Sequence, residues 1–214
     1  MSLGHLAQGK AVRCATIALV MVAAFLFGGM AKQTWFPPHS PSLLSGVLLT
    51  STRPIKDFNL ISEAGTPFIR ADLLGHWTLV FAGYTYCPDF CPTTLAQLKT
   101  VKAKLGADAQ RLKVLFLSVD PGRDTPENLA RYIRYFDPDF RAATGPVTQL
   151  ESLAANLGLV FLKVDDPETG HYEIEHSAQL VLINPEGRLA GFLSPPFILE
   201  TLVADIKTVL ETSP

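Results

Sequence analysis

The chain has 214 residues, with 18 lysine and arginine residues against 20 aspartate and glutamate residues, for a formal net charge of −2. That length is enough for one well-packed domain of ordinary size with a segment left over. Charges of both signs are interspersed and form no basic block or stripe, so the composition argues against electrostatic binding of nucleic acid.

The left-over segment lies near the amino terminus, where residues 14–31 are uncharged and mostly apolar. A helix of that length covers about 27 Å, close to the hydrocarbon thickness of a bilayer. Lys10 and Arg13 precede the run, which predicts a cytoplasmic N-terminus at 1–13, a transmembrane anchor at 14–31 and an exported body. A cleaved signal peptide over the same residues is the alternative.

The rest of the chain divides into a linker and a folded body. Residues 32–52 contain prolines with serines and a glycine between them, and we predict a tether that holds the body away from the membrane. The body, 53–214, alternates strand-like and helix-like segments. In order, we predict a hairpin around Gly65 within 58–70, a buried strand at 77–84, a helix at 93–105, a second buried strand at 112–119, a helix from Pro126 to Phe136 with Thr125 as its cap, a short helix at 148–157, a strand at 160–164, a hairpin of 180–183 and 189–193, and a final helix at 197–210.

This order of elements predicts an α/β fold. The sheet is expected to be mixed, flanked by helices and preceded by one N-terminal transmembrane helix. We interpret the pattern as thioredoxin-like, with insertions that make it a peroxiredoxin-like elaboration of that fold.

Two cysteines four residues apart, Cys87 and Cys91, follow the first buried strand. This is the carboxyl end of a central strand, where the ligand sites of open α/β sheets gather. Pro92 suits the first position of the following helix, which would make Cys91 its cap. The N–H groups of the first helical turn are then expected to lower the pKa of the cysteines.

Three interpretations of the cysteine pair compete. A structural disulfide would close a loop of only five residues and gain about 2 kcal/mol, which a domain of this size hardly needs. A redox dithiol would exchange with disulfides of other proteins. A soft metal is the third, because two thiolates hold Cu(I) linearly and one further ligand closes a trigonal site. Zinc fits less well, since no fourth ligand is visible.

The further ligand would come from one of five histidines. His5 precedes the anchor, His39 lies in the tether, and His76 lies in a turn before the first buried strand. His171 and His176 are five residues apart, so in an extended chain their side chains face opposite sides and at most one can join the cysteines. His176 precedes the apolar strand that borders the cysteine loop in thioredoxin-like folds. Spacing alone leaves its ligation open.

Three blocks of the sequence resemble those of the Sco/SenC family of membrane-anchored copper proteins. The first is Gly83 to Leu95, which contains both cysteines; the second is Leu117 to Pro126; the third joins Glu175-His176-Ser177 to the hairpin Leu182 to Gly187. The blocks occur in the family's order, and the match extends over residues 48–212.

The resemblance implies a thioredoxin-like domain that binds copper, as Cu(I) or Cu(II), through Cys87, Cys91 and His176. It implies a metallochaperone, rather than an enzyme, that delivers copper to the binuclear centre of cytochrome c oxidase during assembly. The implied partners are the copper-receiving oxidase subunit and another copper chaperone. The implied location is the inner membrane, with the C-terminal domain on the periplasmic side. Glu175 and Phe90 depart from the family's usual residues but leave all three ligands in place.

An exported thiol-disulfide reductase is the alternative function. Cys87 and Cys91 would then be a redox-active pair that reduces the cysteines of a copper-receiving partner. Thioredoxin-type reductases carry a cis-proline opposite the dithiol, and here the corresponding stretch, 176–179, contains no proline. That difference argues against general disulfide exchange.

Overall fold

A computed structural model of the chain describes residues 19–22, 42–165, 167–168 and 170–212. The chain divides into two compact units, Met1–Ser40 and Pro41–Pro214. Most of the predicted anchor, 14–31, lies outside the described residues, and its described part, 19–22, is helical. Among the described residues, none of the helices has the length and apolar character needed to span a membrane.

The second unit is built on a mixed sheet of eight strands, in the order β1-β10-β9-β4-β5-β6-β2-β3. A separate two-stranded ribbon consists of β7 and β8. The strands are β1 Gly46–Pro54, β2 Asn59–Ser62, β3 Pro67–Ile69, β4 Trp77–Gly83, β5 Leu112–Ser118, β6 Arg141–Thr144, β7 Phe161–Asp165, β8 Tyr172–His176, β9 Leu180–Ile183 and β10 Arg188–Leu193. The helices are η1 Arg70–Leu73, α2 Phe90–Leu105, η2 Gly106–Arg111, α3 Pro126–Phe136, α4 Val147–Leu157 and α5 Leu199–Glu211.

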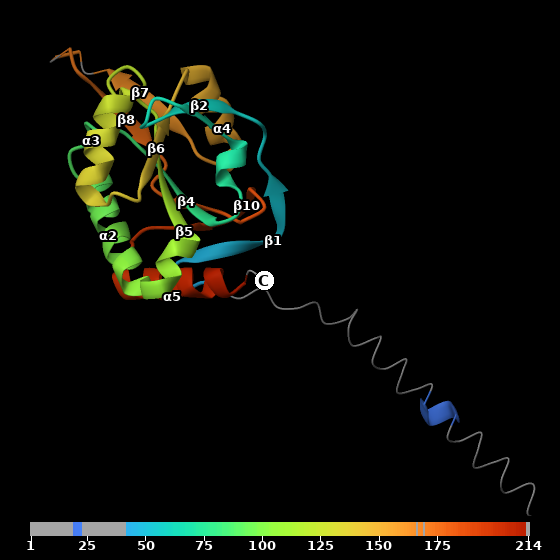
Figure 1. Cartoon of the computed structure of the whole chain (residues 1–214). Coiled ribbons are helices and arrows are strands. Elements are labelled where there is room, and N and C mark those ends of the chain that lie inside the picture. Colours follow the sequence, from blue (N-terminus) through green and yellow to red (C-terminus); the bar gives the residue numbers. More distant parts are fainter. Residues whose placement is uncertain (1–18, 23–41, 166, 169, 213–214) are drawn as a thin grey trace, which may run out of the picture. The chain divides into compact units, whose positions relative to one another are not determined.

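Helices cover both faces of the sheet (Figure 1). On one face, α2, α3 and α5 pack their apolar side chains against alternate residues of β4 and β5, such as Phe81 and Phe116. On the other face, α4 packs against the intervening residues, such as Val80 and Leu117. The predicted α/β architecture, a mixed sheet flanked by helices, is therefore confirmed.

The central strand β4 has all seven residues buried, as its continuous apolar sequence predicts. It pairs in parallel with β5 and antiparallel with β9. Its carboxyl end, Gly83, leads directly into the cysteine loop. The cysteines are therefore held by a strand that has neighbours on both sides.

Local signals placed several element ends correctly. The Thr125 hydroxyl accepts a hydrogen bond from the Asn128 N–H, and Pro126 is the first residue of α3. Gly158 ends α4 in the left-handed conformation. The predicted hairpins are β2–β3 and β9–β10, the latter turning at Gly187 with φ of 67°.

Other boundaries differ from the prediction. Residues 46–52, which we predicted as tether, belong to β1 and pair with β10 at the edge of the sheet. The sequence of β1 does not alternate between apolar and polar residues, which is the pattern by which half-buried strands are recognised. Its proline, Pro54, is typical of an edge strand. The Asp205 carboxylate on α5 accepts hydrogen bonds from the Leu44 and Ser45 N–H groups and fixes the chain just before β1. The last helix begins at Leu199, two residues later than predicted.

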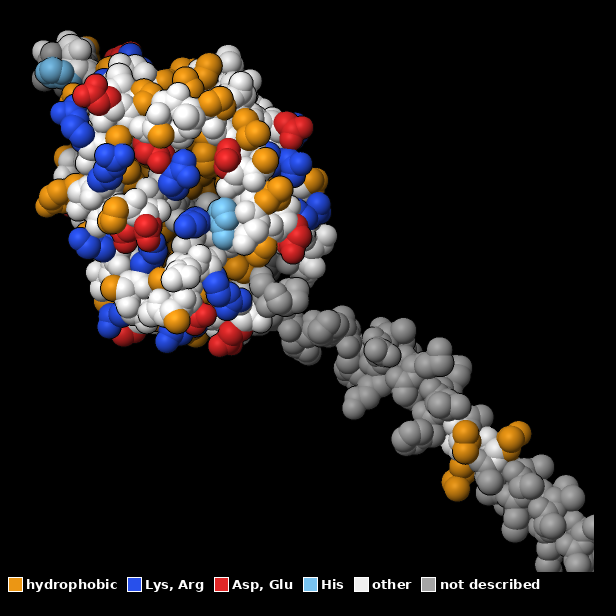
Figure 2. All heavy atoms as spheres, viewed as in Figure 1, with side chains coloured by type: hydrophobic (Ala, Val, Ile, Leu, Met, Phe, Trp, Pro, Cys, Tyr) orange, Lys and Arg blue, Asp and Glu red, His pale blue; other side chains and the backbone are white. Residues whose placement is uncertain are grey.

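The surface agrees with the charge pattern of the sequence. On the face seen in Figure 2, lysine and arginine side chains alternate with aspartate and glutamate. Among the described residues, ion pairs such as Arg70–Asp57 and Arg141–Glu63 join charges of opposite sign. No basic stripe is visible on that face.

Candidate metal centre

The cysteine loop joins the end of β4 to the start of α2. Cys87 lies in the turn, where its N–H donates to the Tyr84 carbonyl, and Cys91 is the second residue of the helix. The Cys91 N–H in turn lies 3.4 Å from Cys87 Sγ and donates to it. The first helical turn therefore directs an N–H group at a cysteine sulfur, as predicted, but the sulfur belongs to Cys87.

The predicted start of this helix was wrong by two to three residues. Asp89 is the cap, and Pro92 occupies the third helical position instead of the first. None of the first N–H groups of a helix has an intrahelical partner, so proline is tolerated throughout the first turn and does not mark one position.

His176 is the last residue of β8, and its side chain reaches the cysteines. Its Nε2 atom lies 3.5 Å from Cys91 Sγ. The ligand atoms of Cys87, Cys91 and His176 all lie within 4.8 Å of one another. The fold thus brings together the three residues that the sequence singled out. Their role as metal ligands remains a prediction.

The orientation of the His176 ring is set by its other nitrogen. Nδ1 lies 3.1 Å from the Ser177 carbonyl oxygen, a group that can only accept a hydrogen bond. We assign the proton to Nδ1, which leaves the Nε2 lone pair directed at the cysteines. Burial lowers the pKa of His176, so the neutral ring that a metal requires is favoured near neutral pH.

Burial separates the two cysteines. Cys91 is completely buried, whereas Cys87 is half-buried. We predicted a lowered pKa for the pair, and for Cys91 this is wrong. Burial raises the pKa of the Cys91 thiol, because the thiolate is removed from water, and the hydrogen bond with the Tyr84 backbone lowers the pKa by less than burial raises it. Cys91 therefore favours the protonated form unless another charge, such as a metal ion, compensates it.

Gly83 makes room for the buried cysteine. A Cβ atom at this position would lie 2.7 Å from Cys91 Sγ and 2.7 Å from Cε2 of Phe116. Only glycine allows so close an approach of the strand backbone to the sulfur.

The buried Asp124 carboxylate forms hydrogen bonds with both the cysteine loop and the end of the neighbouring strand β5. Asp124 is fully buried and accepts hydrogen bonds from the Thr85 N–H at 3.0 Å, the Thr85 hydroxyl at 2.5 Å and the Ser118 hydroxyl at 2.6 Å. Burial raises the pKa of Asp124, and these three donors oppose that rise. Asp124 was not predicted as a site residue, although it lies in the Asp-Thr-Pro start of a helix and in the second block that resembles the Sco/SenC family.

Aromatic residues surround the imidazole. The rings of Phe81 and Tyr84 meet the His176 ring edge-on at 6.1 Å, and the Phe90 ring lies 6.4 Å away. Tyr84 is buried, whereas Tyr86 is 62% exposed beside Cys87. The site is therefore walled by apolar side chains on the protein side and opens to solvent at Cys87.

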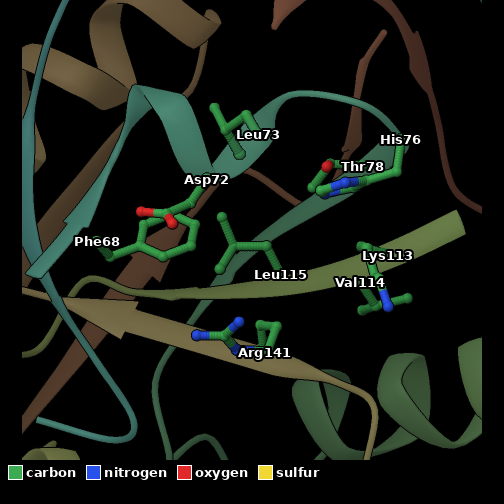
Figure 3. Close-up of a pocket in the computed structure, with 9 residues that line it drawn as sticks. All are labelled: Phe68, Asp72, Leu73, His76, Thr78, Lys113, Val114, Leu115 and Arg141. Atoms are coloured by element: carbon green, nitrogen blue, oxygen red, sulfur yellow. The ribbon is translucent and has the colours of Figure 1, made fainter. Parts of the chain in front are cut away.

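The other described histidines lie elsewhere. His76 lines a cavity of about 80 Å³ with Thr78, Lys113 and Arg141 (Figure 3). The cavity is at the start of β4, about 17 Å of strand from the cysteine loop. Burial and the charge of Lys113 lower the pKa of His76. His171 precedes β8 and is not part of the Cys87–Cys91–His176 group.

Comparison with known proteins identifies the family. The SCO1/SenC family model matches residues 49–211, which is nearly the whole of the second unit. The chain belongs to the SCO1/SenC family. The family expected from the three sequence blocks is thereby confirmed.

Individual SCO1/SenC relatives agree with this assignment. A protein of Stutzerimonas stutzeri described as copper-binding is 35% identical over 166 residues, which cover 77% of this chain and 81% of that protein. The mitochondrial SCO2 homolog of Danio rerio is 32% identical over 175 residues, 78% of this chain but 63% of that protein. Among solved structures, Bradyrhizobium japonicum ScoI with copper bound is 33% identical, with a TM-score of 0.63 over 72% of this chain and 98% of that chain.

Proposed function

We propose that this SCO1/SenC protein is a copper carrier that binds Cu(I) through Cys87, Cys91 and His176. The observation that supports the proposal most directly is the convergence of two thiols and one imidazole nitrogen within 4.8 Å. With the bond lengths of zinc as a guide, about 2.3 Å to sulfur and 2.0 Å to nitrogen, a sulfur and a nitrogen ligand of a trigonal site lie about 3.7 Å apart. The 3.5 Å between Cys91 Sγ and His176 Nε2 is close to that value.

The ligand types suit Cu(I). Thiolates are soft ligands that select Cu(I), and imidazole is a common ligand of copper in either oxidation state. Two thiolates, one neutral imidazole and Cu(I) carry a net charge of −1, so the metal compensates one of the two thiolate charges and favours the deprotonated form of the buried Cys91. Oxidation of the two thiols to a disulfide, with loss of two electrons and two protons to an external oxidant, would remove both sulfur ligands.

Transfer of the metal would begin at Cys87. This cysteine is half-buried and lies beside the exposed Tyr86, whereas Cys91 is completely buried. A thiolate of a docked partner can replace Cys87 first, while Cys91 and His176 still hold the ion. The ion then passes by ligand exchange and is never released to water.

The client proposed for this carrier is the binuclear copper centre of cytochrome c oxidase. The copper-receiving oxidase subunit, and another copper chaperone as donor, are the proposed partners. We propose that residues 14–31 anchor the chain in the inner membrane and that the domain faces the periplasm. Support comes from membership of the SCO1/SenC family and from the apolar sequence of that segment.

A thiol-disulfide reductase is the second candidate. Its support is the half-buried Cys87, whose thiolate can attack a disulfide of the client, form a mixed disulfide and release one client thiol. Cys91 Sγ, within 4.8 Å, can then attack Cys87, close the Cys87–Cys91 disulfide and release the second client thiol. The carrier is favoured because three soft or borderline ligand atoms converge within 4.8 Å, whereas a reductase would need the imidazole only as a base that takes the proton of Cys91.

Anaerobic titration of the reduced full chain with Cu(I), in detergent and against a competing chelator, tests the proposal. We expect one equivalent to bind, and both Cys87→Ser and Cys91→Ser to abolish binding. His176→Ala is expected to weaken binding by more than about 100-fold, since loss of an outer-shell partner alone costs about 10- to 100-fold, and His76→Ala serves as its matched control. If His176→Ala binds as the wild type does but both serine variants fail to reduce a client disulfide, the chain is a reductase instead.

A further inference from the structure

We propose that Arg123 is a positioning residue of the copper site, which sets the distance between the cysteine loop and His176 by joining three tyrosine rings and one carboxylate. This inference rests on the proposed function, because it assigns Arg123 a role in the same site. Arg123 itself belongs to the loop between β5 and α3 and is not one of the proposed ligands.

The ribbon that carries His176 is not part of the main sheet. In the described part of the chain, β7 and β8 pair only with each other (Figure 1). The chain joins the ribbon to α4 at one end and to β9 at the other, and side chains also hold it against the domain. The distance of His176, the last residue of β8, from the cysteines therefore depends in part on those side chains.

The alternation of side chains along β8 shows which of them face the domain and can hold the ribbon against it. Tyr172, Ile174 and His176 are alternate residues and project from the same side of the strand. Ile174 is buried in the core that lies against β4 and β5. Tyr172 at one end of the strand and His176 at the other are thus both directed toward the body of the domain.

Arg123 and Asp120 hold Tyr172. The Arg123 guanidinium lies over the Tyr172 ring at 3.7 Å from its centroid, and its Nη1 donates to the Tyr172 carbonyl at 3.1 Å. The Tyr172 hydroxyl donates to Asp120 at 2.9 Å, and Arg123 Nε forms an ion pair with the same carboxylate. The Asp120 side chain is 4% exposed, so this ion pair is shielded from solvent.

The same guanidinium contacts the cysteine loop. It lies 4.9 Å from the centroid of the Tyr86 ring and 5.5 Å from that of Tyr84. Tyr86 immediately precedes Cys87. Tyr84 meets the His176 ring edge-on at 6.1 Å. Arg123 therefore contacts both segments that carry proposed ligands.

The chemistry of the guanidinium suits this arrangement. Its planar group stacks on aromatic faces while its edge donates to a carboxylate and a carbonyl, which a lysine ammonium cannot do at the same time. Arg123 Nη2 is buried and has no hydrogen-bond partner among the described residues. We attribute this to the tyrosine rings around the group, whose faces attract the cation in place of a hydrogen bond.

The test is a double-mutant cycle on Cu(I) affinity in the reduced full chain, with the same chelator competition. Arg123→Met is expected to weaken Cu(I) binding by about 10- to 100-fold, as loss of an outer-shell group around a metal does. In a His176→Ala background the same change is expected to alter affinity by less than about 2-fold, because the ligand that it positions is gone. Arg134→Met, which removes an exposed arginine of α3, is the matched control and is expected to bind as the wild type does.

Two further results would overturn the proposal. If Arg123→Met lost the same factor in both backgrounds, Arg123 would act independently of His176, through general stability or charge. If Arg123→Lys restored wild-type affinity, charge alone would be sufficient and the stacked guanidinium would not matter. Thermal unfolding of each metal-free variant identifies any that fail to fold, and Tyr172→Leu then removes the same stacking and hydrogen bonds from the ribbon side, with the same expected cycle.

The outcome also separates this inference from the proposed function. If the wild type fails to bind Cu(I), or His176→Ala binds normally, the copper site is wrong and the role of Arg123 falls with it. If His176→Ala is weakened and Arg123→Met equals the wild type, only the role of Arg123 is contradicted.

Discussion

Substitution of Gly83 by alanine should displace the Cys91 sulfur and so lower both the stability of the domain and its affinity for Cu(I). The added Cβ atom would lie 2.7 Å from Cys91 Sγ, 2.7 Å from Phe116 Cε2 and 3.2 Å from Phe116 Cζ. The first two separations are about 0.8 Å shorter than ordinary contact between nonbonded atoms. Cys91 and Phe116 are both completely buried, so neither side chain can move out into solvent.

Overpacking of a buried site by one methyl group lowers the free energy of unfolding by about 1–3 kcal/mol. At about 2 kcal/mol, a domain of this length should lose about 4–8 °C in Tm. A shift of the Cys91 sulfur by about 0.8 Å also exceeds the tolerance of about 0.2 Å for metal–ligand distances, so Cu(I) affinity should fall by at least about 10-fold.

Differential scanning calorimetry and chelator competition on the reduced chain measure the two effects. Gly145→Ala is the matched control: its Cβ would lie 2.8 Å from Leu60 Cδ2, in the other core, and should lower Tm without changing Cu(I) affinity. A Gly83→Ala variant with the wild-type Tm and Cu(I) affinity, or equal loss of copper in both alanine variants, would contradict a specific contact between residue 83 and the Cys91 sulfur.

Two further predictions concern Asp124 and His76. Asp124→Ala leaves the Thr85 N–H, the Thr85 hydroxyl and the Ser118 hydroxyl without their acceptor and should cost about 3 kcal/mol in urea unfolding; a change below about 1 kcal/mol would contradict the role of this carboxylate. Burial and Lys113 lower the pKa of folded His76 below 6.5, so the unfolded chain binds more protons between that lowered pKa and 6.5. The contribution of His76 to the free energy of unfolding should therefore rise with pH across this window, and it is least favourable below the window. His76→Gln should reduce the slope measured between about pH 5 and pH 7, and an unchanged slope would show that His76 does not contribute.

The elements that sequence predicted well have strong local signals. The β4 sequence is apolar throughout, and the turn at Gly187 and the cap at Thr125 each use residues with a specific backbone role. The ribbon strand β8 and the edge strand β1 were not predicted as strands. Their residues are half exposed and their partners are distant in sequence or absent from the main sheet, so no single stretch reveals them.

In the candidate site, too, residues with a distinctive local signal were predicted and residues defined by distant contacts were not. The cysteine pair was found because thiol groups are few and chemically distinctive, whereas His176 was assigned through the resemblance to the Sco/SenC family, since spacing alone left its ligation open. The groups that hold them were not found: Asp124, Arg123 and Tyr172 are ordinary polar residues in sequence. Their importance depends on contacts between residues 39 and 49 positions apart, which no local pattern encodes. The raised pKa of Cys91 was missed for a related reason, because burial depends on the packing of the whole core.

X-ray absorption at the copper K-edge of the Cu(I)-loaded chain would identify the ligands of the bound ion. We expect two sulfur ligands and one nitrogen ligand per copper, with the nitrogen lost in His176→Ala. A wild-type spectrum with two sulfurs and no nitrogen, identical to that of His176→Ala, would contradict the three-ligand site.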